Sequence, residues 1–208
     1  MISKKPELIL NIAGVLITNF SQSFWRNLSE ESNELLKELL IFKNEIRKDL
    51  WTGNISEDDF WLLLKEQFPI VNIKNAQSLL LNTIKPLPAI EIIPIWSQYA
   101  NIHLLSNHRS EWVYPIFKPY MDFITSITVS DQVGYCKPEP KIYEVVNSCI
   151  TNSESVLYVE DQEKNLIPAK ELGWRTMLAD NYCKWVNQIM PMLKEMIGGD
   201  DDHDHLFD

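Results

Sequence analysis

The second half of the chain alternates short apolar segments with segments of helical periodicity, and this alternation constrains the fold more than any other feature. Buried strands are predicted from length and composition at 102–105, 123–129, 156–159 and 175–178. Helical spacing is found at 110–118, 139–149, 163–172 and 182–196. Strict alternation of strand and helix is typical of a parallel sheet with helices on both faces, so we predict an α/β fold.

The first half of the chain adds one strand and then a long helical segment. Residues 8–10 are apolar and lead into the turn-like sequence Asn-Ile-Ala-Gly at 11–14, which predicts a buried strand running into a loop. From residue 20 to about residue 85 the apolar residues recur at helical spacing. Within this segment, Ser56 stands three residues before Asp59, as is typical of a helix N-cap.

Polar residues follow four of the predicted strands at the point where each strand ends. They are Asn11 to Gly14, Ser106 with Asn107, the loop around Lys137, and Glu160 with Asp161. In open parallel sheets, ligands bind at the carboxyl ends of the strands, so these residues are expected to converge on one crevice. A hydroxyl, an ammonium and two carboxylates form a suitable set for holding a phosphate and a divalent cation.

The four segments, in this order, resemble the four motifs of the haloacid dehalogenase superfamily. They read LILNIAGVLIT, HLLSNH, DQVGYCKPEPKIY and VLYVEDQEKNLIPAKELGW, and the last two are the most specific. The sequence Trp51-x-Gly53-x-Ile55-Ser56 is similar to the small helical cap of the subfamily with sugar-1-phosphate phosphatases and the phosphatase domain of soluble epoxide hydrolases. The resemblance implies a Rossmann-like core at 1–18 and 86–197, an inserted helical cap at 19–85, and an acidic tail at 198–208 that we expect to be disordered.

The resemblance also implies roles for the residues at the strand ends. Ser106, with Asn107 beside it, would hydrogen-bond a phosphoryl group, and Lys137 would neutralise its charge. Asp161 would coordinate Mg²⁺ with support from Glu160. The position of Asn11 and the main-chain carbonyl of Ala13 would complete the metal site.

Two residues of the first motif depart from the superfamily pattern. Asn11 stands where family members carry the aspartate that attacks phosphorus and forms an aspartyl-phosphate. A carboxamide is neutral and a poor nucleophile, and it is a weaker ligand for Mg²⁺ than a carboxylate. Ala13 stands where many relatives carry an aspartate that acts as general acid and base, although the subfamily with this cap often has Gly there.

These departures leave different functions open. The chain is a catalytically degenerate member that acts by binding a small phosphorylated metabolite or a protein partner, or it is an active or weakly active Mg²⁺-dependent phosphatase. An Asn at this position is also what a deliberate trapping substitution would introduce, and one sequence is compatible with natural and engineered origins.

The remaining features bear on location and partners. The formal net charge is −10, half of it from the five aspartates of the 198–208 tail, and no Lys/Arg stripe is present, so nucleic acid is an unfavourable partner. No apolar stretch has the length of a membrane helix and no export signal is recognised, and three widely spaced cysteines do not suggest a disulfide framework, so we expect a cytoplasmic protein. His203 and His205 in the tail give a metal-binding alternative there.

Other candidate residues lie beside the motifs. His108 and Arg109 could contact a ligand, although His108 is equally suited to a helix start. Cys136, next to Lys137, is either a reactive thiol or an ordinary loop cysteine. The aromatic residues of the helical segment are expected to form its own core, with Trp51 the one placed to face the crevice.

Overall fold

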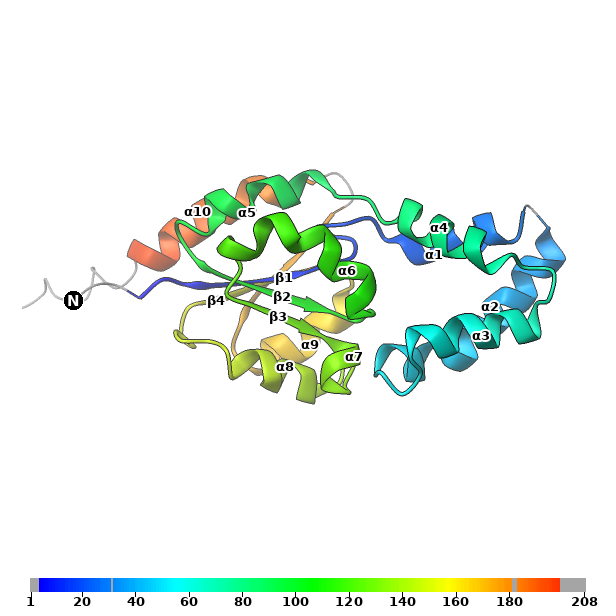
Figure 1. The fold of residues 1–208 in the computed structure, drawn as a ribbon. Coiled ribbons are helices and arrows are strands. Elements are labelled where there is room, and N and C mark those ends of the chain that lie inside the picture. Colours follow the sequence, from blue (N-terminus) through cyan, green and yellow to red (C-terminus); the bar gives the residue numbers. More distant parts are fainter. Residues whose placement is uncertain (1–3, 31, 181–182, 199–208) are drawn as a thin grey trace, which may run out of the picture.

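A five-stranded parallel sheet forms the centre of the molecule (Figure 1). The computed structural model describes residues 4–30, 32–180 and 183–198. The strand order is β3-β2-β1-β4-β5, and every neighbouring pair is parallel. The strands are β1 (Glu7–Asn11), β2 (Asn101–Ser106), β3 (Ser126–Val129), β4 (Val156–Glu160) and β5 (Arg175–Leu178). The predicted α/β fold with a Rossmann-like parallel sheet is confirmed.

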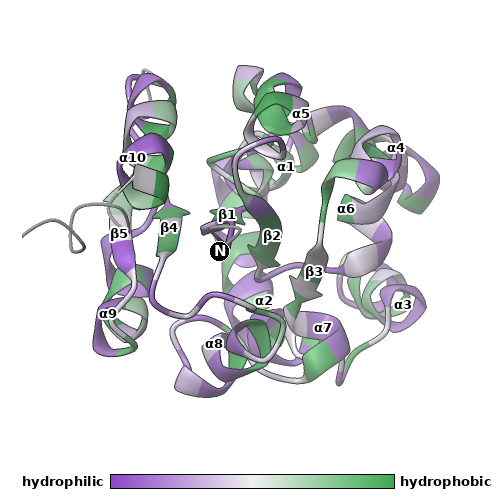
Figure 2. Ribbon diagram, turned by 90° about the vertical axis from the view of Figure 1, so that its left-hand side faces the viewer, coloured by the Kyte–Doolittle hydropathy of each residue, from purple (hydrophilic) through white to green (hydrophobic). Residues whose placement is uncertain are grey.

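Helices cover both faces of the sheet, as Figures 1 and 2 show from two directions. One face carries α5 (Ile93–Trp96) and α10 (Val186–Gly198), and the opposite face carries α8 (Pro140–Asn147) and α9 (Glu163–Glu171). Along β1, Leu8 and Leu10 join the larger core cluster while Ile9 joins the second one. Successive side chains of a strand point to opposite faces, so a run that is apolar throughout is suited to a sheet buried on both sides.

Further short elements connect these layers. They are η1 (Pro88–Ile92), α6 (Ser110–Phe117), η2 (Lys118–Phe123) and α7 (Ser130–Val133). The strand predicted from residue 123 begins only at Ser126, which pairs with His103, because the 3₁₀ turns of η2 occupy the preceding residues. The helix predicted from residue 182 begins only at Val186. The main-chain N–H of Trp185, the preceding residue, donates to the carboxylate of Asp180.

Four helices lie between β1 and η1 in the sequence and project beyond the carboxyl end of the sheet (Figure 1). They are α1 (Phe20–Leu28), α2 (Asn33–Trp51), α3 (Glu57–Gln67) and α4 (Ile73–Thr83), and we refer to them together as the helical segment. The Oγ of Ser56 accepts the main-chain N–H of Asp59 at 3.1 Å, so the predicted N-cap is confirmed. The buried aromatic side chains Trp25, Phe60, Trp61 and Phe68 form much of the interior of this segment, as predicted.

A buried carboxylate ties the opposite, amino end of the sheet together. Glu7 is fully buried, and its Oε2 lies 2.8 Å from Nε2 of His103 on the neighbouring strand. Its Oε1 accepts hydrogen bonds from the side chain and main chain of Thr151 and from the main chain of Asn152. Burial alone would raise the pKa of Glu7, but the hydrogen bonds from His103 and Thr151 outweigh it and lower the pKa to about 2.

The described helices include none that is both long and apolar enough to cross a bilayer.

Candidate functional site

The side chain of Asn11 lies at the carboxyl end of β1, where it is surrounded by oxygen atoms. Its Nδ2 donates to the carbonyl of Ala13 at 2.6 Å, to Oδ1 of Asp161 at 2.8 Å and to Oε1 of Glu160 at 3.0 Å. Its Oδ1 accepts from the main-chain N–H of Ile12 at 2.9 Å and from Nζ of Lys137 at 2.7 Å. If Nδ2 and Oδ1 were exchanged, the N–H₂ group would point at the donors of Ile12 and Lys137, and the oxygen would point at three other oxygens. The network therefore fixes the orientation of the amide.

Lys137 reaches the same point from the loop that follows α7. Its Nζ is buried and donates to Oε2 of Glu160 at 2.6 Å as well as to Asn11. Tyr158 donates its hydroxyl to the same Glu160 oxygen at 2.5 Å. Burial works against the charge of Glu160, but the ammonium of Lys137 lowers the pKa of Glu160, which favours its ionised form.

Asp161 is the second carboxylate of the cluster. Burial and the neighbouring Glu160 raise the pKa of Asp161, because two carboxylates close together disfavour each other's ionised form. The backbone around it is tightly packed: Gly14 has a φ of +83°, and a Cβ added there would lie 2.4 Å from Oδ2 of Asp161. Gly14 is therefore required both by the turn and by the close approach of Asp161.

The residues do not fit the Mg²⁺ that the family resemblance implies. The oxygens of Ala13, Glu160 and Asp161 are of the type that Mg²⁺ prefers, but they converge on Nδ2 of Asn11, an N–H donor that cannot coordinate a cation. The amide oxygen is held on the other side by Lys137 and Ile12. Within the residues that the structure describes, no group of three or more His, Cys, Asp or Glu side chains is arranged to hold a metal ion.

Ser106 and Asn107 follow β2, as predicted, and their side chains have different surroundings. The Oγ of Ser106 is fully buried and has no hydrogen-bond partner among the described residues. The amide of Asn107 is engaged with the main chain of Lys137 in both directions, at 2.7 and 2.8 Å, and it lines the crevice. Asn107 thereby positions the loop that carries Lys137.

The side chains of His108 and Arg109 have different surroundings, and only His108 lines the crevice. His108 lines the crevice with Nδ1 unpartnered among the described residues, and its ring packs against Phe20 and Trp51. Burial and the nearby Lys137 lower the pKa of His108 to about 3, so its imidazole is neutral. Arg109 instead donates to the carbonyl of Ile55 at 2.9 Å and to Glu111, so it anchors the loop after α2.

A crevice of about 380 Å³ lies between the strand ends and the helical segment. It contains Asn11, Ala13, Lys137 and, as predicted, Trp51. Four further cations that we did not single out from the sequence also line it: Lys43, Arg47, Lys48 and Lys164. The spacing of Lys43, Arg47 and Trp51 at i, i+4 and i+8 on α2 places them on one face. From this spacing, the two cations could have been predicted to lie on the same side as Trp51.

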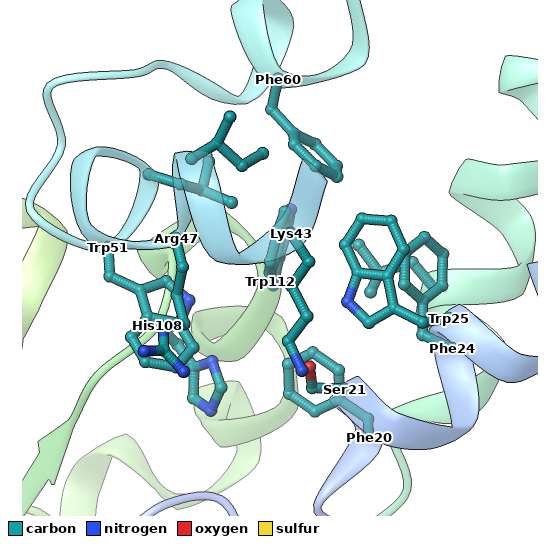
Figure 3. A pocket seen from close by; sticks show the side chains of 13 residues that line it. Phe20, Ser21, Phe24, Trp25, Lys43, Arg47, Trp51, Phe60, His108 and Trp112 are labelled. Atoms are coloured by element: carbon teal, nitrogen blue, oxygen red, sulfur yellow. The ribbon is translucent and has the colours of Figure 1, made fainter. Parts of the chain in front are cut away.

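An aromatic recess adjoins the crevice under the helical segment (Figure 3). Its wall includes Phe20, Phe24, Trp25, Phe60 and Trp112. The recess and the crevice share five lining residues: Ser21, Lys43, Arg47, Trp51 and His108. Aromatic residues predicted to be internal to the helical segment therefore also border a space next to the crevice.

The remaining candidates are the cysteines and the two histidines of the tail. Cys136 lines the crevice but is buried, and burial raises the pKa of its thiol, which does not support a reactive thiolate. All three cysteines are free. The proposed tail site with His203 and His205 lies outside the described residues.

Comparisons with known proteins identify the fold. No protein-family model matches the chain. A D-ribitol-5-phosphate phosphatase of Bacteroides thetaiotaomicron is 27% identical over 162 residues, covering 71% of this chain and 78% of that protein.

Several solved structures share the fold over most of this chain. A predicted haloacid dehalogenase-like hydrolase of Porphyromonas gingivalis has a TM-score of 0.74 at 20% identity, over 92% of this chain and 98% of that one. A haloacid dehalogenase family enzyme of B. thetaiotaomicron, solved with magnesium and inorganic phosphate, has a TM-score of 0.76 at 19% identity, over 89% and 99%. A dehalogenase has a TM-score of 0.64 at 16% identity, over 92% and 98%. The predicted resemblance is confirmed at the level of the fold.

Proposed function

The chain has the fold of the haloacid dehalogenase-like hydrolases, and from this we propose that it binds a small phosphorylated metabolite in the crevice without ordinary turnover. The observation that carries the proposal is the hydrogen bonding of Asn11. Its amide N–H₂ group occupies the point on which the oxygens of Ala13, Glu160 and Asp161 converge, and its oxygen is engaged by Lys137.

The chemistry of the amide supports binding over hydrolysis. Covalent phosphoryl transfer needs a nucleophile activated by a base or by charge, and an amide oxygen that accepts two hydrogen bonds is neither anionic nor free. Ala13 supplies no group for proton transfer. Losing a general acid and base costs on the order of 10²–10⁴ in rate, and losing the nucleophile costs more.

The crevice retains features that suit a phosphate. Lys43, Arg47, Lys48 and Lys164 line it together with Glu139, which pairs with Lys48 at 3.5 Å, so the remaining cations favour an anion in a protein of formal net charge −10. Asn107 and Lys137 line the crevice, and we assign them to contact the phosphate. Ser106 is not among the lining residues, but its buried hydroxyl has no partner among the described residues, and we assign it to the phosphate as well because it adjoins Asn107. The helical segment, at 19–85, acts as the cap that closes over the core formed by 1–18 and 86–197.

A second candidate, a Mg²⁺-dependent phosphatase, is favoured by the 27% identical D-ribitol-5-phosphate phosphatase. It requires the amide of Asn11 to leave its present hydrogen bonds. In that function Asn11 stands in place of the aspartate that acts as nucleophile in family members. Glu160, Asp161 and the Ala13 carbonyl would then coordinate the ion.

Hydrolysis assays distinguish the two functions. The purified protein and an Asn11→Asp variant are assayed on D-ribitol 5-phosphate and p-nitrophenyl phosphate, with and without Mg²⁺. We expect no turnover by the unaltered protein and a gain of activity only in the variant with Mg²⁺. Turnover by the unaltered protein at a rate comparable to the variant contradicts the proposal and supports the phosphatase.

Calorimetric titration of the unaltered protein with phosphorylated compounds tests binding itself. Measurable heat that saturates at one equivalent supports the metabolite-binding function. If neither inorganic phosphate nor any phosphate ester binds, the binding of a protein partner is the function that remains.

A further inference from the structure

We infer that the organic part of the ligand is a single flat apolar ring or a similarly small apolar group, which enters the aromatic recess while the phosphate lies between Lys137 and the Lys43–Arg47 pair. This inference rests on the proposed function, since it specifies which class of phosphate ester the crevice takes.

The crevice and the recess are adjoining spaces with a shared border. Ser21, Lys43, Arg47, Trp51 and His108 line both the crevice and the recess, so they surround the opening between them. Figure 3 shows the Lys43 side chain extending between the aromatic rings, with its amino group toward Ser21 at one side of the space. A molecule whose phosphate lies in the crevice therefore has a route for its other end into the recess.

The recess is apolar in character. Apart from the residues at the opening, its wall is aromatic and aliphatic, with Phe24, Phe60, Trp112, Leu50 and Leu80 among its members. An apolar ring gains from contact with such a wall, whereas the hydroxyl groups of a polyol would lose hydrogen bonds to water there. The recess thus disfavours the extended polyol of a sugar-alcohol phosphate.

The recess is small. Its internal volume is about 40 Å³. One water takes roughly 10–15 Å³ by this measure, whereas a cavity that encloses a whole benzene ring measures about 150 Å³. The recess therefore admits the edge of a single ring or a group of similar width, and it excludes a fused aromatic system.

Positive charge is distributed unevenly around the crevice. The ammonium of Lys137 is matched by Glu160 at 2.6 Å, with Asp161 next to it, so the floor of the crevice has no positive charge in excess. Lys43 and Arg47 lie one turn apart on α2, and neither has an acidic partner within 4 Å among the described residues. Burial and the charge of Arg47 lower the pKa of Lys43, and a bound dianion would relieve the repulsion between the two cations.

Titration calorimetry with three probes tests the ligand class. Phenyl phosphate carries an anion and a ring, D-ribitol 5-phosphate carries an anion and a polyol, and inorganic phosphate is the anion alone. We expect phenyl phosphate to bind about tenfold tighter than the other two, because it alone buries apolar surface in the recess. Equal or tighter binding of D-ribitol 5-phosphate overturns the inference and leaves the proposed function intact. Failure of all three probes to bind overturns both.

A substitution at the opening tests the location of the ring. Ser21→Phe fills the opening, and we expect it to remove the preference for phenyl phosphate over inorganic phosphate. Ser23→Phe adds the same bulk at an exposed position of α1 and serves as the matched control. A preference that survives Ser21→Phe places the ring elsewhere and contradicts the inference.

A second pair of variants tests the charge. Lys43→Gln is expected to weaken phenyl phosphate binding by about tenfold, as for the loss of one charge-assisted contact. Lys37→Gln removes the same charge from an exposed position of α2 outside the crevice and is expected to change the affinity less than twofold. Equal effects of the two substitutions would contradict a specific role for Lys43.

Discussion

The side chain of Asn11 differs from a carboxylate by one N–H₂ group, and this group determines the charge balance of the crevice floor. An aspartate there would place a third carboxylate beside Glu160 and Asp161, with Lys137 as the buried cation between them. The amide instead donates to both carboxylates, so the floor is held together without an added cation.

We predict that Asn11→Asp couples the stability of the protein to Mg²⁺. In EDTA the variant is expected to be less stable than the unaltered protein by roughly 1–3 kcal/mol, because the hydrogen bonds that the amide donates to Glu160 and Asp161 are replaced by like-charge repulsion. Millimolar Mg²⁺ is expected to raise the melting temperature of the variant only. Asn44→Asp, at an exposed position of α2, is the control for the added charge. A Mg²⁺-dependent rise in the unaltered protein would contradict our account of the amide.

A second prediction concerns the buried hydroxyl of Ser106. Its buried Oγ has no partner among the described residues, so Ser106→Ala is expected to leave the free energy of unfolding unchanged or to increase it by up to about 1 kcal/mol. The affinity for inorganic phosphate is expected to fall about tenfold. Ser130→Ala truncates a nearby serine whose Oγ donates to the His108 carbonyl, and it should lose stability instead. Lost stability with unchanged affinity in Ser106→Ala would assign Ser106 a structural role.

Among the elements, the loop after α2 packs closely against the core. A Cβ at Gly53 would lie 2.3 Å from the main-chain oxygen of Asp131 in α7, and Gly53 has a φ of +80°. Arg109 donates a hydrogen bond to the same loop, at the carbonyl of Ile55. The position of Trp51 at the opening of the recess therefore depends on a glycine two residues away.

Replacing this glycine should displace the loop. Gly53→Ala is expected to lower the free energy of unfolding by about 2 kcal/mol, through backbone strain and the clash with Asp131. Gly134→Ala is a matched control, since its φ is +78° and a Cβ there would meet nothing within 4 Å. We expect the control to lose only about 1 kcal/mol in urea denaturation. Equal losses would mean that the loop accommodates the methyl group freely.

The amino end of β1 gives a pH prediction. The pKa of Glu7 is lowered from 4.5 to about 2 in the folded protein, so its carboxylate contributes stability that is present above pH 4.5 and is lost as the pH falls towards 2. The shift corresponds to roughly 3 kcal/mol. Glu7→Gln should flatten the acid side of the stability profile measured by denaturation between these two pH values, and Glu154→Gln, at an exposed position, should not. An unchanged slope in Glu7→Gln would exclude this carboxylate as the cause.

For the whole molecule, the formal net charge is negative, whereas the lining of the crevice is mainly cationic. The chain carries 29 acidic and 19 basic residues, yet the crevice wall presents Lys43, Arg47, Lys48 and Lys164 beside one acidic residue, Glu139. Exposed charges act over about 10 Å at 0.1 M salt, so the attraction of an anion to this wall is local and is weakened by salt.

We predict that the affinity for phenyl phosphate falls severalfold between about 0.05 and 0.5 M NaCl, because the screening length shortens over this range. The enthalpy of transferring the ring should change little. Titration calorimetry at several salt concentrations measures both. An affinity that is independent of salt would mean that the partly exposed cations of α2 do not contact the phosphate.

The sequence was sufficient for the architecture because strand and helix periods are local. The apolar runs of β1, β2 and β4 identify the sheet, and the polar residues at their ends identify the crevice. The contribution of α2 could not be predicted in the same way, since Lys43 and Arg47 face the crevice only once the helical segment is placed over the strand ends. The bonding of Asn11 likewise depends on Glu160 and Asp161, which are distant in sequence.

The composition of the recess has a practical consequence. Three of the seven tryptophans, Trp25, Trp51 and Trp112, border the space into which we place the ring. Indole emission is sensitive to contact with an aromatic neighbour and to the removal of water. The protein therefore carries an intrinsic optical reporter, and occupancy of the recess can be followed by quenching without attaching a dye.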